Sequence, residues 1–235
     1  MDVIEIIKES LVYPTNNLMA LLIYIVLCVI AALVLVTTVG GLYLGSTLKN
    51  VLVTGVSGIV GIVVAIIISF LISGYMLDVL KLGIQHSNDS PRIDFSRQVI
   101  NGLKLFIVDV VYLIIPAILF VVLSMIFAQW LAVLLGIIIS IIFAFVLVIA
   151  ECRLANTENL SDALAFGDAF NDLQRVGVVN IVQLIVILAV VFFVVFLITG
   201  AIGQLNAYIG SVLSAIASVY LLFVQKRATG LLYSQ

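Results

Sequence analysis

The residue whose type and position most plainly suggest chemistry is Asp109, which lies inside a long apolar stretch. Ionisable groups within membrane-spanning segments are rare and are functional candidates by default. Asp109 follows Lys104 by five residues, about 7.5 Å further along a helix, so we expect it near the headgroup boundary. It could pair with Lys104 or Arg175, hydrogen-bond to Asn180, or couple to a proton or an ion. We favour the structural pairing.

Other polar side chains near the apolar stretches complete a candidate intramembrane cluster. Asn180 and Gln183 are three residues apart, so they share a helix face, where we expect hydrogen bonds between helices rather than a substrate contact. Tyr75 and Tyr112 could line a cavity on the cytoplasmic side or belong to the interfacial aromatic belt, and we expect the belt. The candidate cluster comprises Tyr75, Lys104, Asp109, Tyr112, Arg175, Asn180 and Gln183.

No catalytic group is expected. An intramembrane enzyme needs a nucleophile beside a base, or clustered metal ligands, and the single histidine, His86, lies outside the apolar stretches. His86 with Asp89 and Asp94 is a poor match to any defined metal site. We therefore expect no catalytic residue, no metal, no cofactor and no nucleic-acid partner.

The polar segment 151–175 carries an excess of acids, with five acids and two bases. Pairing with bases on the same surface is the simpler interpretation. The alternative is an acidic face that docks a cytosolic protein, because anionic lipid would repel such a face. The residues of this candidate docking face are Glu158, Asp162, Asp168 and Asp172.

The elements that must position these residues are membrane spans. The chain is 65% apolar and only 9% charged, far from the composition of soluble domains. A helix needs about 20 mostly apolar residues to span the hydrocarbon. Six runs qualify, at roughly 18–48, 51–80, 105–128, 131–150, 176–198 and 205–224. The sequence thus predicts an all-α integral membrane protein with six transmembrane helices in one membrane domain.

The six spans form three predicted hairpins, at 18–80, 105–150 and 176–224, followed by a tail at 225–235. A polar segment with amphipathic helical spacing precedes each hairpin, at 1–17, 81–104 and 151–175. The second and third units align without gaps at an offset of 71 residues, so that Lys104 matches Arg175 and Asp109 matches Asn180. We predict three parallel hairpin repeats about an axis along the membrane normal, each led by a cytoplasmic interfacial helix.

The bases predict the orientation. Nine of the ten Lys and Arg residues fall at the N-terminus, in the two long polar segments or in the tail, and Lys49 alone falls on the other side. Lys and Arg in short loops mark the cytoplasmic side. The acidic start lacks the pattern of a cleaved signal peptide. We expect a multi-pass plasma-membrane protein with both termini in the cytoplasm.

Small residues recur at helical spacing along three of the expected spans, which predicts close helix contacts. They are Gly41, Gly45, Gly55, Gly58, Gly61, Ser211, Ser214, Ala215 and Ser218.

Several short motifs carry a family resemblance. The stretches GYM at 74–76, PRIDF at 91–95 and NGLK at 101–104, followed by Val111, Tyr112 and Pro116, resemble the central signature of the archaeal domain-of-unknown-function 4013 family. The closing residues Arg227, Gly230, Leu231 and Tyr233 are similar to the C-terminal pattern of that family. The resemblance covers most of the chain and implies a multi-span archaeal membrane protein with no established activity. Asn101 stands where the family more often has an acid, so this position is not treated as a functional carboxylate.

Three classes of function remain. A membrane scaffold or accessory subunit would recruit a cytosolic or membrane protein on the cytoplasmic side, and it requires least of the residues present. A small-solute or lipid permease would place the candidate cluster on the wall of a cavity that opens to the cytoplasm. An intramembrane enzyme fits least. We favour the scaffold, with the lipid bilayer as its surroundings; a hydrated cavity that reaches Asp109 would favour the permease.

Overall fold

The computed structural model describes residues 2–235, and this part of the chain is helical throughout apart from turns and one loop. Six of its helices are long and apolar enough to cross a membrane, so the predicted six-span architecture is confirmed. The helices are α1 (Val3–Asn16), α2 (Leu18–Thr47), α3 (Val51–Ile84), α4 (Phe95–Ile126), α5 (Gln129–Thr157), α6 (Leu160–Ala163), α7 (Phe166–Val176), α8 (Val178–Leu205) and α9 (Ala207–Tyr233).

Local signals set the ends of these helices. The side chains of Asn50, Asp94 and Asn206 accept backbone N–H groups at the starts of α3, α4 and α9, which satisfies donors that a helix start leaves free. Gly177 separates α7 from α8 with a φ of 86°, a conformation that favours glycine. No such break follows Phe95 within α4. In the segment 81–104, which was expected to hold a separate interfacial helix, residues 81–84 end α3, 85–94 form a loop, and 95–104 are the first part of α4.

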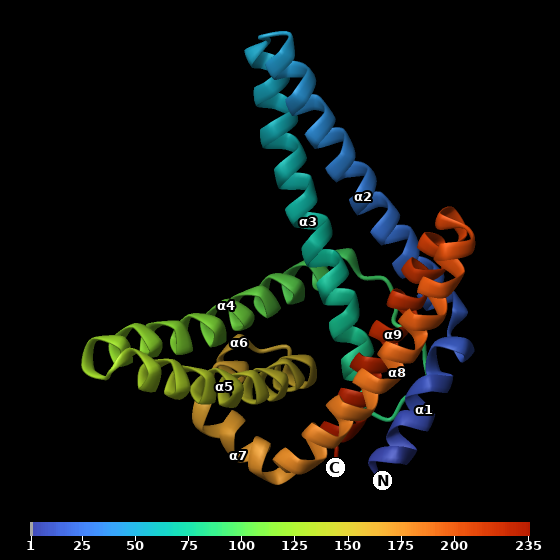
Figure 1. Cartoon of the computed structure of the whole chain (residues 1–235). Coiled ribbons are helices and arrows are strands. Elements are labelled where there is room, and N and C mark those ends of the chain that lie inside the picture. The colour runs from blue at the N-terminus through green and yellow to red at the C-terminus, as the bar shows by residue number, and fades with distance from the viewer. Residues whose placement is uncertain (1) are drawn as a thin grey trace.

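The long helices form three hairpins: hairpin 1 (α2 and α3), hairpin 2 (α4 and α5) and hairpin 3 (α8 and α9). Figure 1 shows them diverging from a common end, with hairpin 1 rising to the top, hairpin 2 turned to the left, and α1 and both termini beside that end. The three turns all point away from the common end. The three turns thus lie at the far ends of diverging arms, whereas parallel repeats about a single axis stay a prediction.

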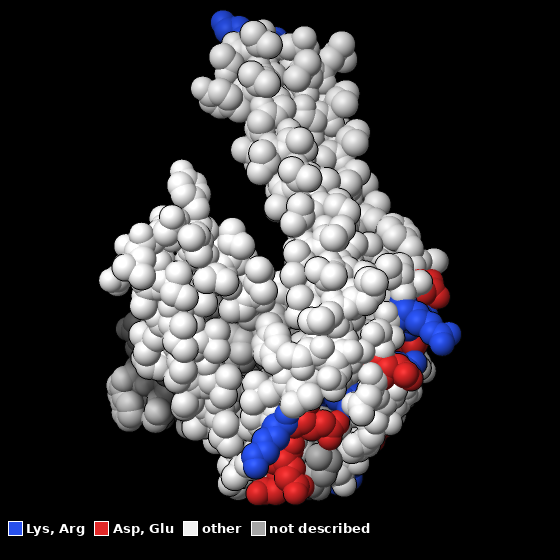
Figure 2. Space-filling model, turned by 90° about the vertical axis from the view of Figure 1, so that its right-hand side faces the viewer, with Lys and Arg blue, Asp and Glu red and all other residues white. Residues whose placement is uncertain are grey.

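Charge is concentrated where the hairpins meet. Figure 2 shows acidic and basic side chains gathered at one end and almost none along the projecting arms; Lys49 lies in the turn of hairpin 1. We call this end the charged base, after its ion-paired residues Glu9, Asp78, Lys81, Arg97, Arg153, Glu158, Asp172 and Arg227.

Beneath the charged base lies the apolar core. One cluster of buried side chains joins residues of α1, α4, α5, α7, α8 and α9. A second, aromatic cluster packs Tyr24, Tyr75 and Phe223 together. The arms beyond this core expose many large apolar side chains, as expected for surfaces that face lipid.

Glycines allow the closest helix crossings. A Cβ at Gly102 would lie 1.9 Å from the Phe70 carbonyl oxygen, and one at Gly74 would lie 1.9 Å from that of Gln98, so α3 and α4 touch backbone to backbone. In hairpin 1, a Cβ at Gly45 would lie 2.4 Å from Thr54 Oγ1 and one at Gly61 would lie 2.1 Å from Thr38 Oγ1, on the partner helix in each case.

The predicted close contacts of small residues are therefore confirmed for much of hairpin 1, where Gly41 and Gly58 also pack tightly, but not everywhere. Nothing lies within 4 Å of a Cβ at Gly55. Ser211, Ala215 and Ser218 are exposed on the outer face of α9.

Candidate functional site

One polar site in the charged base joins α3, α4 and the end of α5. Arg97 forms two parallel hydrogen bonds with Asp78, each 2.8 Å long, the geometry in which guanidinium and carboxylate bind most specifically. Gln98 adds a third bond, from Nε2 to Asp78 Oδ2, at 2.7 Å. Arg97 Nη1 also donates to Glu158 Oε1 over 3.0 Å. A single guanidinium thus ties hairpin 1 to both helices of hairpin 2.

Glu158 is the meeting point of three bases. Lys81 donates to its Oε1 over 2.7 Å, and Lys104 donates to its backbone carbonyl over 2.7 Å. The residue adopts a left-handed backbone conformation as it ends α5, which turns its side chain and carbonyl toward these donors. Burial is the largest single influence on this carboxyl and opposes its ionisation. The hydrogen bonds from Lys81 and Asn101, together with the nearby positive charges, outweigh burial and hold the pKa of Glu158 below its usual value.

A second site surrounds Arg227 of α9, whose side chain is fully buried. Its guanidinium donates to Glu9 of α1, to Asn88, and to the backbone carbonyls of Leu82 and Ser87. It also lies over the ring of Tyr13, 4.8 Å from the centroid. Arg227 therefore holds the loop after α3 against α1 and α9.

The third polar site joins α5, α7 and the end of α9. Arg153 donates to Asp172 Oδ2 over 2.7 Å and to Asp168 over 3.2 Å. The Tyr233 hydroxyl donates to the same Asp172 oxygen over 2.9 Å, and Arg175 lies over the Tyr233 ring. Although burial opposes ionisation, the hydrogen bonds from Arg153 and Tyr233 hold the pKa of Asp172 below its usual value.

The structure does not gather the candidate intramembrane cluster into one place. Lys104 binds Glu158, and Arg175 binds Asp172 and the Tyr233 carbonyl. The Asn180 side chain of α8 donates to the backbone carbonyl of Val176, the last residue of α7, four positions earlier. Gln183 is exposed on α8, so neither amide forms the expected hydrogen bond to another membrane span.

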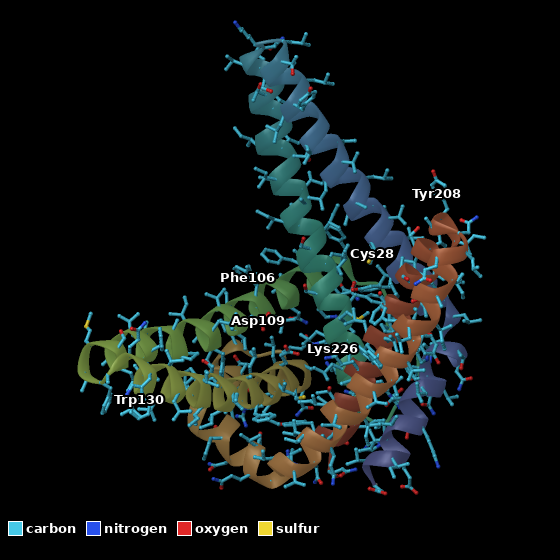
Figure 3. The ribbon with its side chains drawn as sticks, viewed as in Figure 1. Cys28, Phe106, Asp109, Trp130, Tyr208 and Lys226 are labelled. Atoms are coloured by element: carbon cyan, nitrogen blue, oxygen red, sulfur yellow. The ribbon has the colours of Figure 1, made fainter. Side chains whose placement is uncertain are left out.

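The expectation that Tyr75 and Tyr112 belong to the interfacial aromatic belt is wrong. Both are fully buried, and a backbone carbonyl of another segment accepts a hydrogen bond from each hydroxyl, so neither hydroxyl is left unpaired. Tyr75 donates to Ala20 of α2 and Tyr112 to Ala163 of α6. Exposed aromatic residues lie instead near the three hairpin turns, at Tyr43, Trp130 and Tyr208; Figure 3 labels the latter two at the tips of hairpins 2 and 3.

The charged neighbours of Asp109 are ones that the sequence did not reveal. Lys104, Arg175 and Asn180 are all engaged elsewhere, and the charges that act on Asp109 are those of Glu151 on α5 and Lys226 on α9. Figure 3 places Asp109 and Lys226 where α4 and α9 approach the middle of the molecule. Lys226 was assigned to a polar tail because the apolar run ends at Val224, whereas α9 continues to Tyr233.

The candidate docking face is largely occupied by bonds within the chain. Glu158 and Asp172 each have basic partners, and Arg153 Nε donates a hydrogen bond to the backbone carbonyl of Asp162. Asp168 is the most exposed of the four, at 64% of its side chain. The simpler sequence interpretation, pairing on one surface, thus describes three of the four acids, Glu158, Asp168 and Asp172, and protein docking there stays a prediction.

Clefts in this region are of two kinds. A polar cleft of about 410 Å³ lies between α3 and the loop at 85–94, with Lys81, Arg92 and Glu158 on its wall. An apolar cleft of about 670 Å³ separates α4 from α5 and is lined by hydrocarbon except at Tyr112 and Ser140. Asp109 lines neither. Within residues 2–235 no three His, Cys, Asp or Glu side chains are grouped as metal ligands, and His86 instead contacts Ser234.

Comparison with known proteins gives one match. The model of a family described as a protein of unknown function, DUF4013, matches residues 57–204. A search of the curated proteins found no match, and neither did a search of the solved structures. The matched region runs from hairpin 1 to the end of α8 and contains the Arg97 site and Asp109. Since it covers more than half of the sequence, the chain belongs to the DUF4013 family.

Proposed function

We propose that the protein is a non-enzymatic membrane scaffold or accessory subunit of the plasma membrane that binds its partners on the cytoplasmic side, where both termini lie. The observation that carries the proposal is the charged base. Its ion pairs connect helices of all three hairpins and α1, so the base is a fixed platform. An archaeal source, which the resemblance implies, stays a prediction.

The apolar arms support the same role. Large side chains such as Leu113 and Ile137 on hairpin 2, and Val186 and Phe193 on hairpin 3, are exposed. Within a bilayer these flanks meet either lipid or the helices of another protein. The hairpins diverge from the base (Figure 1), and Figure 2 shows open space beside the projecting arm, where transmembrane helices of a partner would pack.

The permease alternative has less support. A solute path needs polar groups along its wall, whereas the larger cleft between α4 and α5 is apolar. Of its two hydroxyls, that of Tyr112 is already donated to Ala163. The absence of an enzymatic role is likewise part of the proposal, and it rests on the lack of a nucleophile paired with a base among the described spans.

Site-specific photocrosslinking in native membranes tests the scaffold. A photoreactive amino acid at Gln174, exposed on α7 at the base, is expected to give one adduct of discrete mass. That adduct should disappear when Arg97→Ala disrupts the platform and persist with Arg175→Ala, which removes a half-exposed arginine.

Flux measurements provide the opposing outcome. The purified protein in sealed liposomes is expected to pass no ions or small solutes beyond the leak of protein-free liposomes. Solute-specific flux by the purified chain, together with no adduct at Gln174 in native membranes, would overturn the scaffold in favour of the permease.

A further inference from the structure

We propose that Asp109, Glu151 and Lys226 form an intramembrane site that binds one proton, held on Asp109. The three residues come from α4, α5 and α9, so the site bridges hairpins 2 and 3. It is separate from the platform of the charged base and goes beyond the proposed scaffold role. Seven residues separate Lys226 from the end of α9, which places the site about 10 Å inside that end.

The geometry begins with a close ion pair. Lys226 Nζ lies 2.5 Å from Glu151 Oε2, and each side chain is only 19% exposed. Lys226 thus donates a charge-assisted hydrogen bond to Glu151 rather than to Asp109. Asp109 also acts on the Lys226 charge, but it makes no hydrogen bond to it.

Asp109 is left without a donor. Its Oδ1 atom is buried and has no hydrogen-bond partner among the described residues. Leaving an ionised, buried carboxylate oxygen unpaired is costly, and the usual response is uptake of a proton.

The charge balance leads to the same conclusion. Two carboxylates and one ammonium leave one negative charge when all three are ionised. Lys226 cancels the charge of Glu151, so one positive charge is still needed beside Asp109. A proton supplies it by converting the Asp109 carboxylate to the neutral acid, with no other bond made or broken.

A metal cation would fit this site poorly. The Lys226 ammonium, 2.5 Å from Glu151, would repel a second cation at the same carboxylate. Two carboxylates also provide fewer ligands than a defined metal site requires. The proton is therefore the ligand that the residue types favour.

The other charged side chains of the packed helices have partners of their own. Lys104 of α4 donates to the backbone carbonyl of Glu158. From α3, Asp78 and Lys81 pair with Arg97 and Glu158. Arg153 of α5 turns toward the acids of α7.

On α9, Arg227 binds Glu9 of α1, and the remaining titratable neighbour of the site is Cys152. The charge of the site thus depends on its own three residues, and proton uptake changes the attraction between Asp109 and Lys226 across the junction of hairpins 2 and 3.

Infrared spectroscopy of the full chain in liposomes tests the site without any substrate. A protonated carboxyl has a C=O stretching band that an ionised carboxylate lacks. The wild type at neutral pH is expected to show this band, and Asp109→Asn is expected to lose it. Asp168→Asn, which changes an exposed surface acid, is expected to keep it.

A second measurement does not depend on how Asp109→Asn folds. If the aspartate side-chain carbons of the wild type carry a heavy isotope, the band must shift, because it belongs to an aspartic acid. The proposal is overturned if the wild type shows no such band at neutral pH, if the band survives Asp109→Asn, or if it fails to shift with labelled aspartate.

Discussion

Arg227 of α9 binds Glu9 of α1: its Nη2 atom donates to Glu9 Oε1 over 2.7 Å, and the two residues are 218 positions apart in the sequence. The same guanidinium donates to the backbone carbonyls of Leu82 and Ser87. The last helix therefore fixes both the first helix and the loop that leads from hairpin 1 to hairpin 2. The base is complete only when α9 is in place.

Arg227→Met is expected to lower the free energy of unfolding by about 3–5 kcal/mol, because it leaves Glu9 and two carbonyls without their donor in a buried site. Titration of the purified protein from mild detergent into a denaturing detergent measures the loss. Arg175→Met is the matched control, since its side chain is 46% exposed and such surface pairs contribute about 0–1 kcal/mol. Equal losses of unfolding free energy in the two variants would contradict this stabilising role of Arg227.

Gly102→Ala is expected to destabilise the contact between α3 and α4 by about 1–3 kcal/mol, as overpacking does. The added Cβ would lie 1.9 Å from the Phe70 carbonyl oxygen, and backbone cannot move aside as a side chain can. Thermal unfolding in one detergent compares it with Gly55→Ala, where a Cβ meets open space. The control should be at least as stable as the wild type, because alanine favours the helical conformation. A Gly102→Ala protein as stable as this control would contradict the close backbone contact between α3 and α4.

The six spans could be predicted because each is a local property, a run of apolar residues long enough to cross hydrocarbon. The partners of the polar residues could not. Tyr75 looks like a belt residue in the sequence, but its acceptor is the carbonyl of Ala20, 55 positions away. Only the packing of α2 against α3 places that carbonyl within reach.

Lys226 illustrates the other limit of the sequence. Two consecutive bases after an apolar run predict the end of a span, yet α9 continues as helix past both. It can do so because Glu151 and Glu9 come from other helices to meet Lys226 and Arg227. The same long-range pairing explains why the charged neighbours of Asp109 are Glu151 and Lys226 rather than the residues that the sequence suggested.

The predicted orientation can be tested with thiol reagents. Cys152 is fully buried and Cys28 lies within span α2, so the natural chain is expected to resist a membrane-impermeant maleimide. In intact cells, Ser46→Cys at the tip of hairpin 1 should react, whereas Gln174→Cys on α7 should react only after the membrane is permeabilised. The reverse pattern would place the charged base outside the cell.

The exposed aromatics at the hairpin tips predict a second membrane interface. Trp130 is the single tryptophan and follows the turn of hairpin 2, so the intrinsic fluorescence reports its depth. We expect lipids brominated near the headgroup to quench it more than lipids brominated near the chain end. Ile137→Trp combined with Trp130→Phe moves the reporter seven residues, about 10 Å, along α5 and should reverse the order. If the order of quenching by the two brominated lipids is unchanged, the tip of hairpin 2 does not lie at the membrane interface.

The pH dependence of stability should follow the lowered pKa values of Glu158 and Asp172. The two carboxylates bind protons less readily in the folded state than in the unfolded chain, where carboxyl groups titrate at about pH 4. The stabilisation from both acids is therefore complete above that pH, and it is lost as the pH falls through the lower pKa values of the folded state.

Two variants isolate the Asp172 part of this effect. Asp172→Asn is expected to be less stable than the wild type at neutral pH, and the gap should narrow as the pH falls below about 4, where the wild-type carboxylate also loses its charge. Tyr233→Phe keeps the carboxylate but removes one of its donors, so its acid-induced loss should begin at a higher pH. Unfolding midpoints measured in one detergent across the pH range test both expectations. If the difference in midpoint between Asp172→Asn and the wild type stays constant to the lowest pH, the charge of Asp172 contributes nothing to the stability of the fold.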